Sequence, residues 1–227
     1  MPLFVVATPI GNLEDLTHRA ERILKEADWI AAEDTRHTGQ LLTRLGIKAK
    51  FISFHEQNEK NRTPEILEKL KRGETVALVS DAGTPSISDP GFVLVRECHK
   101  FQIPVYSIPG PSAVLAALTS SGLPTNRFLF EGFLPKKPGK RRGRIEELKE
   151  LEATLIFFES PFRTAKLLND LHQILGSRPA AVGRELTKKF EETQTGTLAE
   201  LAEHFSNHPP KGEITVVVGG KDSRAKD

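Results

Sequence analysis

The 227-residue sequence has little that could cross-link the chain or anchor it in a membrane. It contains one cysteine, Cys98, which excludes an intramolecular disulfide framework and a cysteine-ligated zinc site. The longest uninterrupted apolar run, residues 113–118, has six residues, whereas a membrane-spanning helix needs about 20. No basic, apolar leader opens the chain. We therefore expect a globular protein of the reducing cytoplasm, without a membrane partner.

Several common catalytic motifs are also missing. The loop after the first apolar run is not GxGxxG, and GxxxxGK[ST], HExxH and GxSxG do not occur. The seven histidines show no spacing typical of metal ligands. These absences argue against the common types of dehydrogenase, P-loop enzyme, zinc protease and serine hydrolase, and we expect no metal.

The first half of the sequence alternates short apolar runs with segments of helical periodicity. Strands are predicted at 3–6, 28–32, 51–54, 75–80 and 103–108. Gly46 and Gly73 mark helix ends, whereas Thr63-Pro64 and Asp89-Pro90 are typical of helix starts. Strands that are apolar throughout and alternate with helices indicate a mostly parallel sheet with helices on both faces.

The alternation breaks at 121–128, where Gly, Pro and Asn cluster. Further strands are predicted at 127–133, 154–158, 180–186 and 213–220, and Thr197 with Glu200 forms a capping box. We therefore predict an α/β protein of two domains. Their bounds are 1–121 for an N-terminal α/β domain, 122–220 for a smaller C-terminal mixed-sheet α/β domain, and 221–227 for a frayed tail.

A basic segment, KKPGKRRGR at 136–144, holds six basic residues and no acid, although the net charge of the chain is only +2. Two interpretations stand side by side. The segment is either a solvated surface loop or a contact for a phosphate backbone. Its basic residues are Lys136, Lys137, Lys140, Arg141, Arg142 and Arg144.

The loops that follow the predicted strands of the first half are rich in Gly, Pro, small hydroxyls and charge. They read ATPIGN (7–12), EDTRHT (33–38), FHEQNE (54–59), SDAGTPSISDPG (80–91) and PGPSA (109–113). Ligands of open parallel sheets bind beyond the carboxyl ends of the strands, so these loops predict a binding rim. Asp81 follows a buried strand, where a carboxylate is costly without a partner such as a ligand hydroxyl, amine or cation. Asp89, in contrast, is better explained as the N-cap of the next helix.

These loops, together with FEGFLP, FFESPFR and KGEITVVVGG further along, resemble the motifs of the tetrapyrrole-methylase fold family from about residue 3 to residue 220. The likeness is to members that 2′-O-methylate a cytidine ribose in the decoding region of small-subunit ribosomal RNA. It implies S-adenosylmethionine as methyl donor, two α/β domains, a dimer, and ribosomal RNA or the assembled small subunit as partner.

The resemblance also implies site residues. The donor would be held by Pro9, Ile10, Asp81, Gly83, Thr84, Ser112, Ala113, Phe158 and Leu186. The basic segment 136–144 would then bind RNA. Tetrapyrrole-modifying members carry Gly-Asp-Pro in the fourth loop, where this chain has Ser80-Asp81-Ala82.

A ribose hydroxyl is a very weak acid, so its proton needs an acceptor. Asp34 and His37 are the first candidates on the rim, ahead of His55, Glu56 and Glu59. Asp34 is equally suited to a structural ion pair with Arg36. Two other functions fit the sequence: methylation of a small molecule such as a tetrapyrrole, and RNA binding without catalysis during ribosome assembly.

Overall fold

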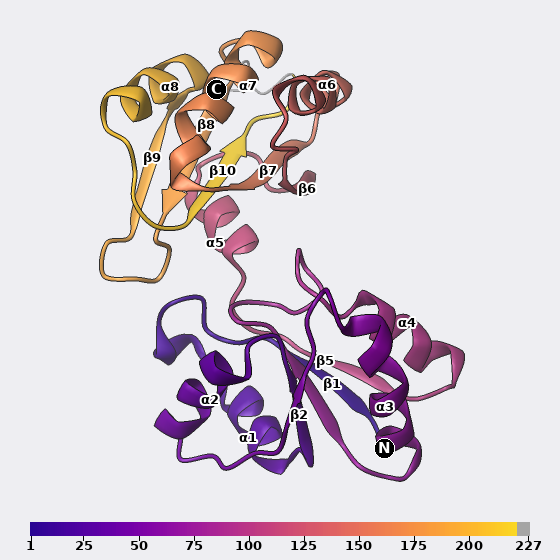
Figure 1. The fold of residues 1–227 in the computed structure, drawn as a ribbon. Coiled ribbons are helices and arrows are strands. Elements are labelled where there is room, and N and C mark those ends of the chain that lie inside the picture. Colours follow the sequence, from indigo (N-terminus) through magenta and orange to yellow (C-terminus); the bar gives the residue numbers. More distant parts are fainter. Residues whose placement is uncertain (222–227) are drawn as a thin grey trace. The chain divides into compact units, whose positions relative to one another are not determined.

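The computed structural model describes residues 1–221, and the chain divides into two compact units, Met1–Ser112 and Ala113–Asp227 (Figure 1). The division lies before helix α5 (Ala113–Ser120), not at 121/122 as the loss of alternation suggested. The helix belongs to the second unit because it packs against strands β8 (Pro179–Arg184) and β10 (Ile214–Val218). With α5 included, the second unit is no longer the smaller one.

The first unit is built on a fully parallel five-stranded sheet of order β3-β2-β4-β1-β5. The strands are β1 (Leu3–Val6), β2 (Trp29–Ala32), β3 (Phe51–Ser53), β4 (Val76–Val79) and β5 (Val105–Ile108). The helices are η1 (Leu13–Asp15), α1 (His18–Glu26), α2 (Thr35–Arg44), α3 (Glu59–Lys71) and α4 (Phe92–Lys100). The predicted parallel sheet is confirmed.

Helices cover both faces of this sheet because every second side chain of each strand points to the same face. One core cluster joins Leu24 of α1 and Leu42 of α2 to the strands. The other joins Leu70 of α3 and Leu94 of α4 to the opposite face. Helices thus cover most of both faces, and the polar loops lie at the ends of the strands.

The second unit holds a mixed sheet of order β6-β7-β10-β8-β9, in which β6 is parallel to β7 and the other neighbours are antiparallel. Its further elements are β6 (Phe128–Phe133), α6 (Pro138–Leu148), β7 (Thr154–Glu159), η2 (Pro161–Arg163), α7 (Thr164–Leu175), β9 (Glu192–Thr197) and α8 (Leu198–Asn207). Helices α6, α7 and α8 share one core cluster with the sheet. The mixed α/β architecture and the capping box at Thr197 are confirmed.

Two helices begin elsewhere than the sequence predicted. Helix α3 begins at Glu59, and the Thr63 hydroxyl bonds the Glu59 carbonyl instead of capping a helix. Helix α4 begins at Phe92, because Glu59 Oε1 accepts the backbone N–H groups of Gly91 and Val93 at 2.9 and 3.2 Å. Asp89 therefore does not cap α4.

Two further elements were misjudged from sequence. Strand β9, ETQTGT, was missed because it has no apolar residue to signal burial. Most of the basic segment is not a loop but the first turns of α6, which opens on Pro138.

No helix within residues 1–221 combines the length and the apolarity needed to cross a membrane. Of the expected frayed tail, 222–227 lie outside the described residues, and the Lys221 N–H bonds the Leu151 carbonyl.

Candidate active site

The carboxyl edge of the first sheet brings three of the predicted loops together. Thr8, after β1, and Gly83, after β4, form a two-bond antiparallel bridge with N–O distances of 2.9 and 3.0 Å. The Thr84 hydroxyl donates to the Pro111 carbonyl after β5, at 3.3 Å. Pro9, Ile10, Gly83 and Thr84, which the family resemblance assigns to the donor, therefore share one small region of the rim. Ser112 closes the first unit and Ala113 opens α5, so these two follow directly along the chain.

Glycine lets these loops approach closely. Gly83 has φ +79°, and a Cβ at this position would lie 3.3 Å from the Ile10 side chain. A Cβ at Gly110 would lie 3.0 Å from that of Ala7. Ser86 and Ser88, in the same fourth loop as Gly83, also have positive φ values of 72° and 62°, which is strained for residues with a side chain. Glycine at these positions thus lets the backbones of the rim loops pack against one another.

Three carboxylates gather at the exits of β2 and β4. Asp81 Oδ1 accepts the Asp34 N–H at 3.0 Å, so Asp81 holds the second loop as well as facing the rim. Burial raises the pKa of Glu33, and the charges of Asp89 and Asp81 raise it further. Burial likewise raises the pKa of Asp89, with a smaller contribution from Asp81. None of the ion pairs formed by described Lys and Arg residues involves Glu33, Asp81 or Asp89. The cluster therefore suits a cationic or hydroxyl-bearing ligand.

The two predicted proton acceptors lie at the start of α2. The Asp34 side chain caps this helix, accepting the N–H groups of Arg36 at 2.8 Å and His37 at 3.4 Å. The hydrogen bond from the Arg36 N–H is the main cause that lowers the pKa of Asp34. Its contact with Arg36 is through the backbone and not the guanidinium, so the expected ion pair is replaced by a cap. His37 is exposed on the first turn of the helix.

The other rim candidates divide by role. Glu59 is committed to the start of α4, as described above, while Glu56 is exposed. The His55 N–H donates to Asn58 Oδ1 at 2.9 Å. Glu33 is the rim carboxylate that the sequence analysis missed. Its position directly after β2, one residue before Asp34, was the available signal.

In the second unit, Phe158 and Leu186 lie on one face and at one end of the sheet. Phe158 of β7 is in register with Thr215 of β10, which is in register with Gly183 of β8. The Leu186 side chain covers Gly183, where a Cβ would lie 3.2 Å from it. The structure thus brings into one row the two residues of this unit that the family resemblance assigns to the donor.

The basic segment differs from the prediction. Arg141 is only 2% exposed, and its guanidinium pairs with Asp170 of α7. Arg142 bonds Asp170 and Gln173, and Arg144 forms a two-bond pair with Glu131 at 2.6 and 2.9 Å. The expectation of six solvent-facing cations is therefore wrong for Arg141, and Arg142 and Arg144 already have acidic partners. Lys136, Lys137 and Lys140 are exposed, and none of them is in an ion pair with a described residue.

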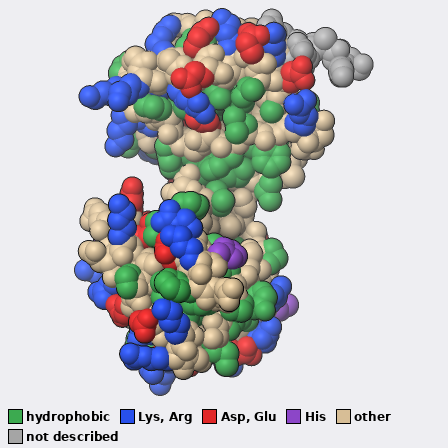
Figure 2. Space-filling view, turned by 90° about the vertical axis from the view of Figure 1, so that its right-hand side faces the viewer, with side chains coloured by type: hydrophobic (Ala, Val, Ile, Leu, Met, Phe, Trp, Pro, Cys, Tyr) green, Lys and Arg blue, Asp and Glu red, His purple; other side chains and the backbone are tan. Residues whose placement is uncertain are grey.

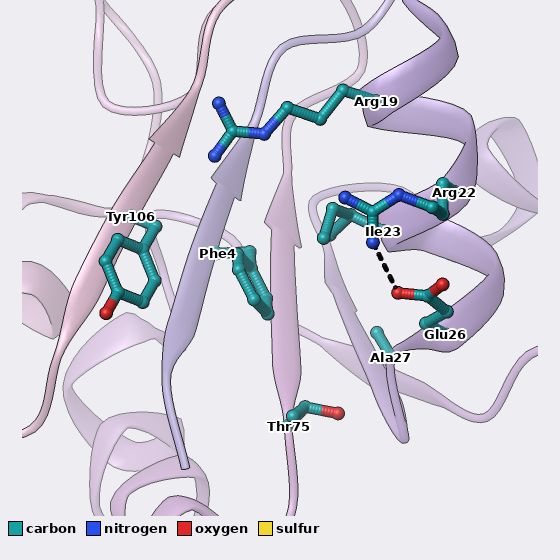
Figure 3. A pocket seen from close by; sticks show the side chains of 8 residues that line it. All are labelled: Phe4, Arg19, Arg22, Ile23, Glu26, Ala27, Thr75 and Tyr106. Carbon is teal, nitrogen blue, oxygen red and sulfur yellow. Dashed lines mark hydrogen bonds and ion pairs between the residues drawn. The ribbon is translucent and has the colours of Figure 1, made fainter.

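A separate depression of about 350 Å³ lies on the α1 face of the first sheet (Figure 3). It is lined by Phe4, Arg19, Arg22, Ile23, Glu26, Ala27, Thr75 and Tyr106. Arg22 is paired with Glu26 at 2.8 Å, and the rings of Phe4 and Tyr106 are 5.8 Å apart. None of the predicted site residues lines this depression. Nowhere in residues 1–221 do three or more His, Cys, Asp or Glu side chains group so as to hold a metal ion.

The family model described as tetrapyrrole (corrin/porphyrin) methylases matches residues 2–202, and the chain belongs to this family. A protein of Mesorhizobium japonicum named Ribosomal RNA small subunit methyltransferase I is 53% identical, over 99% of this chain and 77% of that protein. The protein of the same name from Thermotoga maritima is 49% identical, over 97% of this chain and 99% of that protein. Uroporphyrin-III C-methyltransferase from Thermus thermophilus, solved in complex with S-adenosyl homocysteine, has a TM-score of 0.66 at 20% identity, over 96% of this chain and 97% of that chain. Family membership makes the protein a methylase and confirms the predicted fold.

Proposed function

We propose that the protein is an S-adenosylmethionine-dependent methyltransferase that 2′-O-methylates a cytidine ribose in the decoding region of small-subunit ribosomal RNA. The names of the relatives at about 50% identity support the acceptor class, since those proteins are methyltransferases of small-subunit ribosomal RNA. The S-adenosyl homocysteine in the Thermus thermophilus enzyme supports the donor. A dimer in the cytoplasm belongs to the same proposal, from the family resemblance.

The observation that carries the proposal is the rim of the first unit, where half-buried carboxylates without a cationic partner adjoin loops joined closely through glycine. A donor with a sulfonium and an amino group supplies the missing positive charge. Asp81 is the carboxylate that we assign to a donor amine or hydroxyl, because it directly follows a buried strand. The Asp34 N–H bonds one of its oxygens, Oδ1, and the other oxygen would bond the donor. Gly83 and Gly110 allow the loops to pack this closely, because a side chain at either position would crowd Ile10 or Ala7.

The remaining donor contacts are those that the family resemblance implies. Pro9, Ile10 and Thr84 would border the donor on the rim, and Ser112 and Ala113 offer amides at the start of α5. Phe158 and Leu186 would supply the apolar wall for adenine.

The donor supplies a methyl group on a positively charged sulfur, from which it passes in line to an oxygen. The chain's contribution is first to hold the acceptor oxygen close to that line, and positioning of this kind provides much of an enzyme's acceleration. The second contribution is to receive the ribose proton. Asp34 and His37 are the predicted acceptors, and Glu33 joins them because its raised pKa makes it a stronger base than Asp34.

Two measurements test the proposal. Titration calorimetry should detect S-adenosylmethionine binding to the protein alone. Small subunits from cells lacking the enzyme, incubated with protein and donor, should gain one 2′-O-methylcytidine that nuclease mapping and mass spectrometry locate. Donor binding without RNA methylation would favour a small-molecule acceptor, and RNA binding without donor binding would favour an assembly protein.

A further inference from the structure

Two neighbouring strands of the second sheet leave their carboxyl ends side by side. β6 and β7 are parallel, with Phe133 in register with Phe158. Adjacent strands lie about 4.8 Å apart, so the turns that follow them, 134–137 and 160–163, begin as neighbours. We call this region the β6–β7 corner.

The corner presents aromatic rings to solvent. Phe162, in the turn after β7, is 98% exposed, and Phe133, at the end of β6, is 60% exposed. The Phe133 ring lies 5.6 Å from that of Phe158, which is itself 4.8 Å from Phe130. A phenyl ring that is almost wholly in water adds nothing to folding, so Phe162 is explained by a binding partner better than by the fold.

The corner is also positively charged, because its acids are neutralised and its lysines are not. Glu159 is buried and paired with Arg163, and Glu131 is paired with Arg144. Lys136 and Lys137 lie three and four residues after Phe133, and Lys140 lies in the first turn of α6. Figure 2 faces the β6 and α6 side of the second unit and shows hydrophobic side chains gathered there with Lys and Arg beside them.

Buried ion pairs hold both turns in place. Arg141 Nη1 donates to the Lys136 carbonyl at 3.3 Å while its Nε donates to Asp170 at 2.7 Å. Glu159 Oε1 accepts the Ser160 N–H and Arg163 Nε, both at 2.7 Å. Arg141 is thus a positioning residue, which fixes the turn that carries two lysines.

From this arrangement we infer that the β6–β7 corner binds an unpaired stretch of RNA, with Phe162 and Phe133 stacking on bases and Lys136, Lys137 and Lys140 contacting phosphates. Exposed aromatic rings can stack only on bases that are not paired, and lysines beside them follow the backbone without reading sequence. The inference rests on the proposed function and deepens it, since it assigns the surface that would hold the RNA substrate.

The first test measures binding of a labelled single-stranded RNA of about 12 nucleotides, within the range of known single-strand sites. Phe162→Ala should weaken binding about 5- to 150-fold, which is the usual effect of removing one stacking ring. The melting temperature should not change, because the ring is exposed. Phe101→Ala is the matched control, since Phe101 is a 52% exposed phenylalanine of the first unit, and it should bind as the wild type does.

The second test measures the salt dependence of the same binding. Lys136→Gln with Lys137→Gln should reduce the slope of log affinity against log salt by about 1.4, at about 0.7 for each phosphate contact to a single strand. The control is Lys25→Gln with Lys48→Gln, two exposed lysines of the first unit, for which the slope should not change.

Several results would overturn the inference. One is an unchanged RNA affinity and an unchanged salt slope in the corner variants, while the wild-type protein methylates ribosomal RNA. That result would leave the proposed function intact. A second is an equal loss of duplex RNA binding in Phe162→Ala, which would exclude stacking on unpaired bases. A third is a changed oligomeric state with unchanged RNA affinity, which would make Phe162 a subunit contact. In contrast, RNA binding that depends on Phe162 in a protein that methylates no RNA would overturn the proposed function and keep this surface.

Discussion

The two units treat their buried carboxylates in opposite ways. In the second unit, Asp170 and Glu159 are each held by an arginine, at distances down to 2.5 Å. In the first unit, Glu33 and Asp89 are half-buried beside Asp81, and their pKa values are raised. Like charges that share a partly dry site are a cost to the folded state.

This difference separates architecture from function. A paired buried charge is satisfied within the fold, so it positions neighbouring segments, as Arg141 does for Lys136. A carboxylate cluster without a cationic partner keeps its charge uncompensated until a ligand arrives, so it indicates a binding site. The comparison predicts that changes in the second unit's pairs act on stability, whereas changes in the first unit's cluster act on ligand affinity and pH dependence.

The largest effect is expected for Arg141→Ala. Removal of Arg141 leaves the buried Asp170 carboxylate with only the exposed Arg142 as a partner, so the cost in folding free energy should approach that of a broken buried pair, about 3–5 kcal/mol. Arg142→Ala is the matched control, because Arg142 contacts the same carboxylate from an exposed position and should cost about 1 kcal/mol or less.

Chemical denaturation can assign this loss to one unit. Trp29, the only tryptophan, lies in β2, so its fluorescence follows the first unit while circular dichroism follows both. Arg141→Ala should move the circular dichroism transition and leave the fluorescence transition in place. Equal losses in Arg141→Ala and Arg142→Ala would contradict the architectural role of the buried pair.

The case of Arg141 also shows where sequence analysis stops. The strands of the described residues other than β9 were predictable because each contains a short run of apolar residues. The rim loops were predictable because parallel strands end at one edge. The pairing of Arg141 with Asp170 was not, since 29 residues separate them and no local pattern signals the contact. The same holds for Glu59, which starts α4 from 32 residues upstream. Both errors, the exposure of Arg141 and the start of α4, therefore arose from polar contacts between residues far apart in the sequence.

In the candidate site, the sequence located the loops but not the links among them. Asp81 was assigned a ligand, yet it also holds the Asp34 N–H. Asp34 was predicted to accept the ribose proton, yet its side chain also caps α2. Both residues have a structural and a proposed functional role, and only variants that separate the two roles can measure each.

Asp81 is expected to produce the next largest effect, on donor affinity. Asp81→Ala should weaken S-adenosylmethionine binding about 10- to 100-fold, since a lost charged hydrogen bond costs about 1.5–3 kcal/mol. Asp81→Asn keeps an acceptor for the Asp34 N–H but loses the charge, so a similar loss would assign the effect to charge. Calorimetry measures both, with Glu56→Gln, an exposed carboxylate on another rim loop, as control. Unchanged affinity in folded Asp81→Ala would remove Asp81 from the site.

The smallest effect concerns Glu33 and the pH dependence of stability. Burial, with Asp89 and Asp81, raises its pKa above the ordinary 4.5, so the folded state retains this proton longer than the unfolded state. That contribution to stability is complete below pH 4.5 and is lost as the pH rises through the raised value. The Glu33 carboxylate accepts the Asp81 N–H. Glu33→Gln keeps an oxygen for this hydrogen bond and removes the charge. The variant should match the wild type below pH 4.5 and be more stable at pH 7, by less than about 1 kcal/mol because the site is partly solvated. Melting curves from pH 4 to pH 8 measure this difference, and a variant less stable than the wild type at pH 7 would show that the Glu33 charge is compensated within the fold.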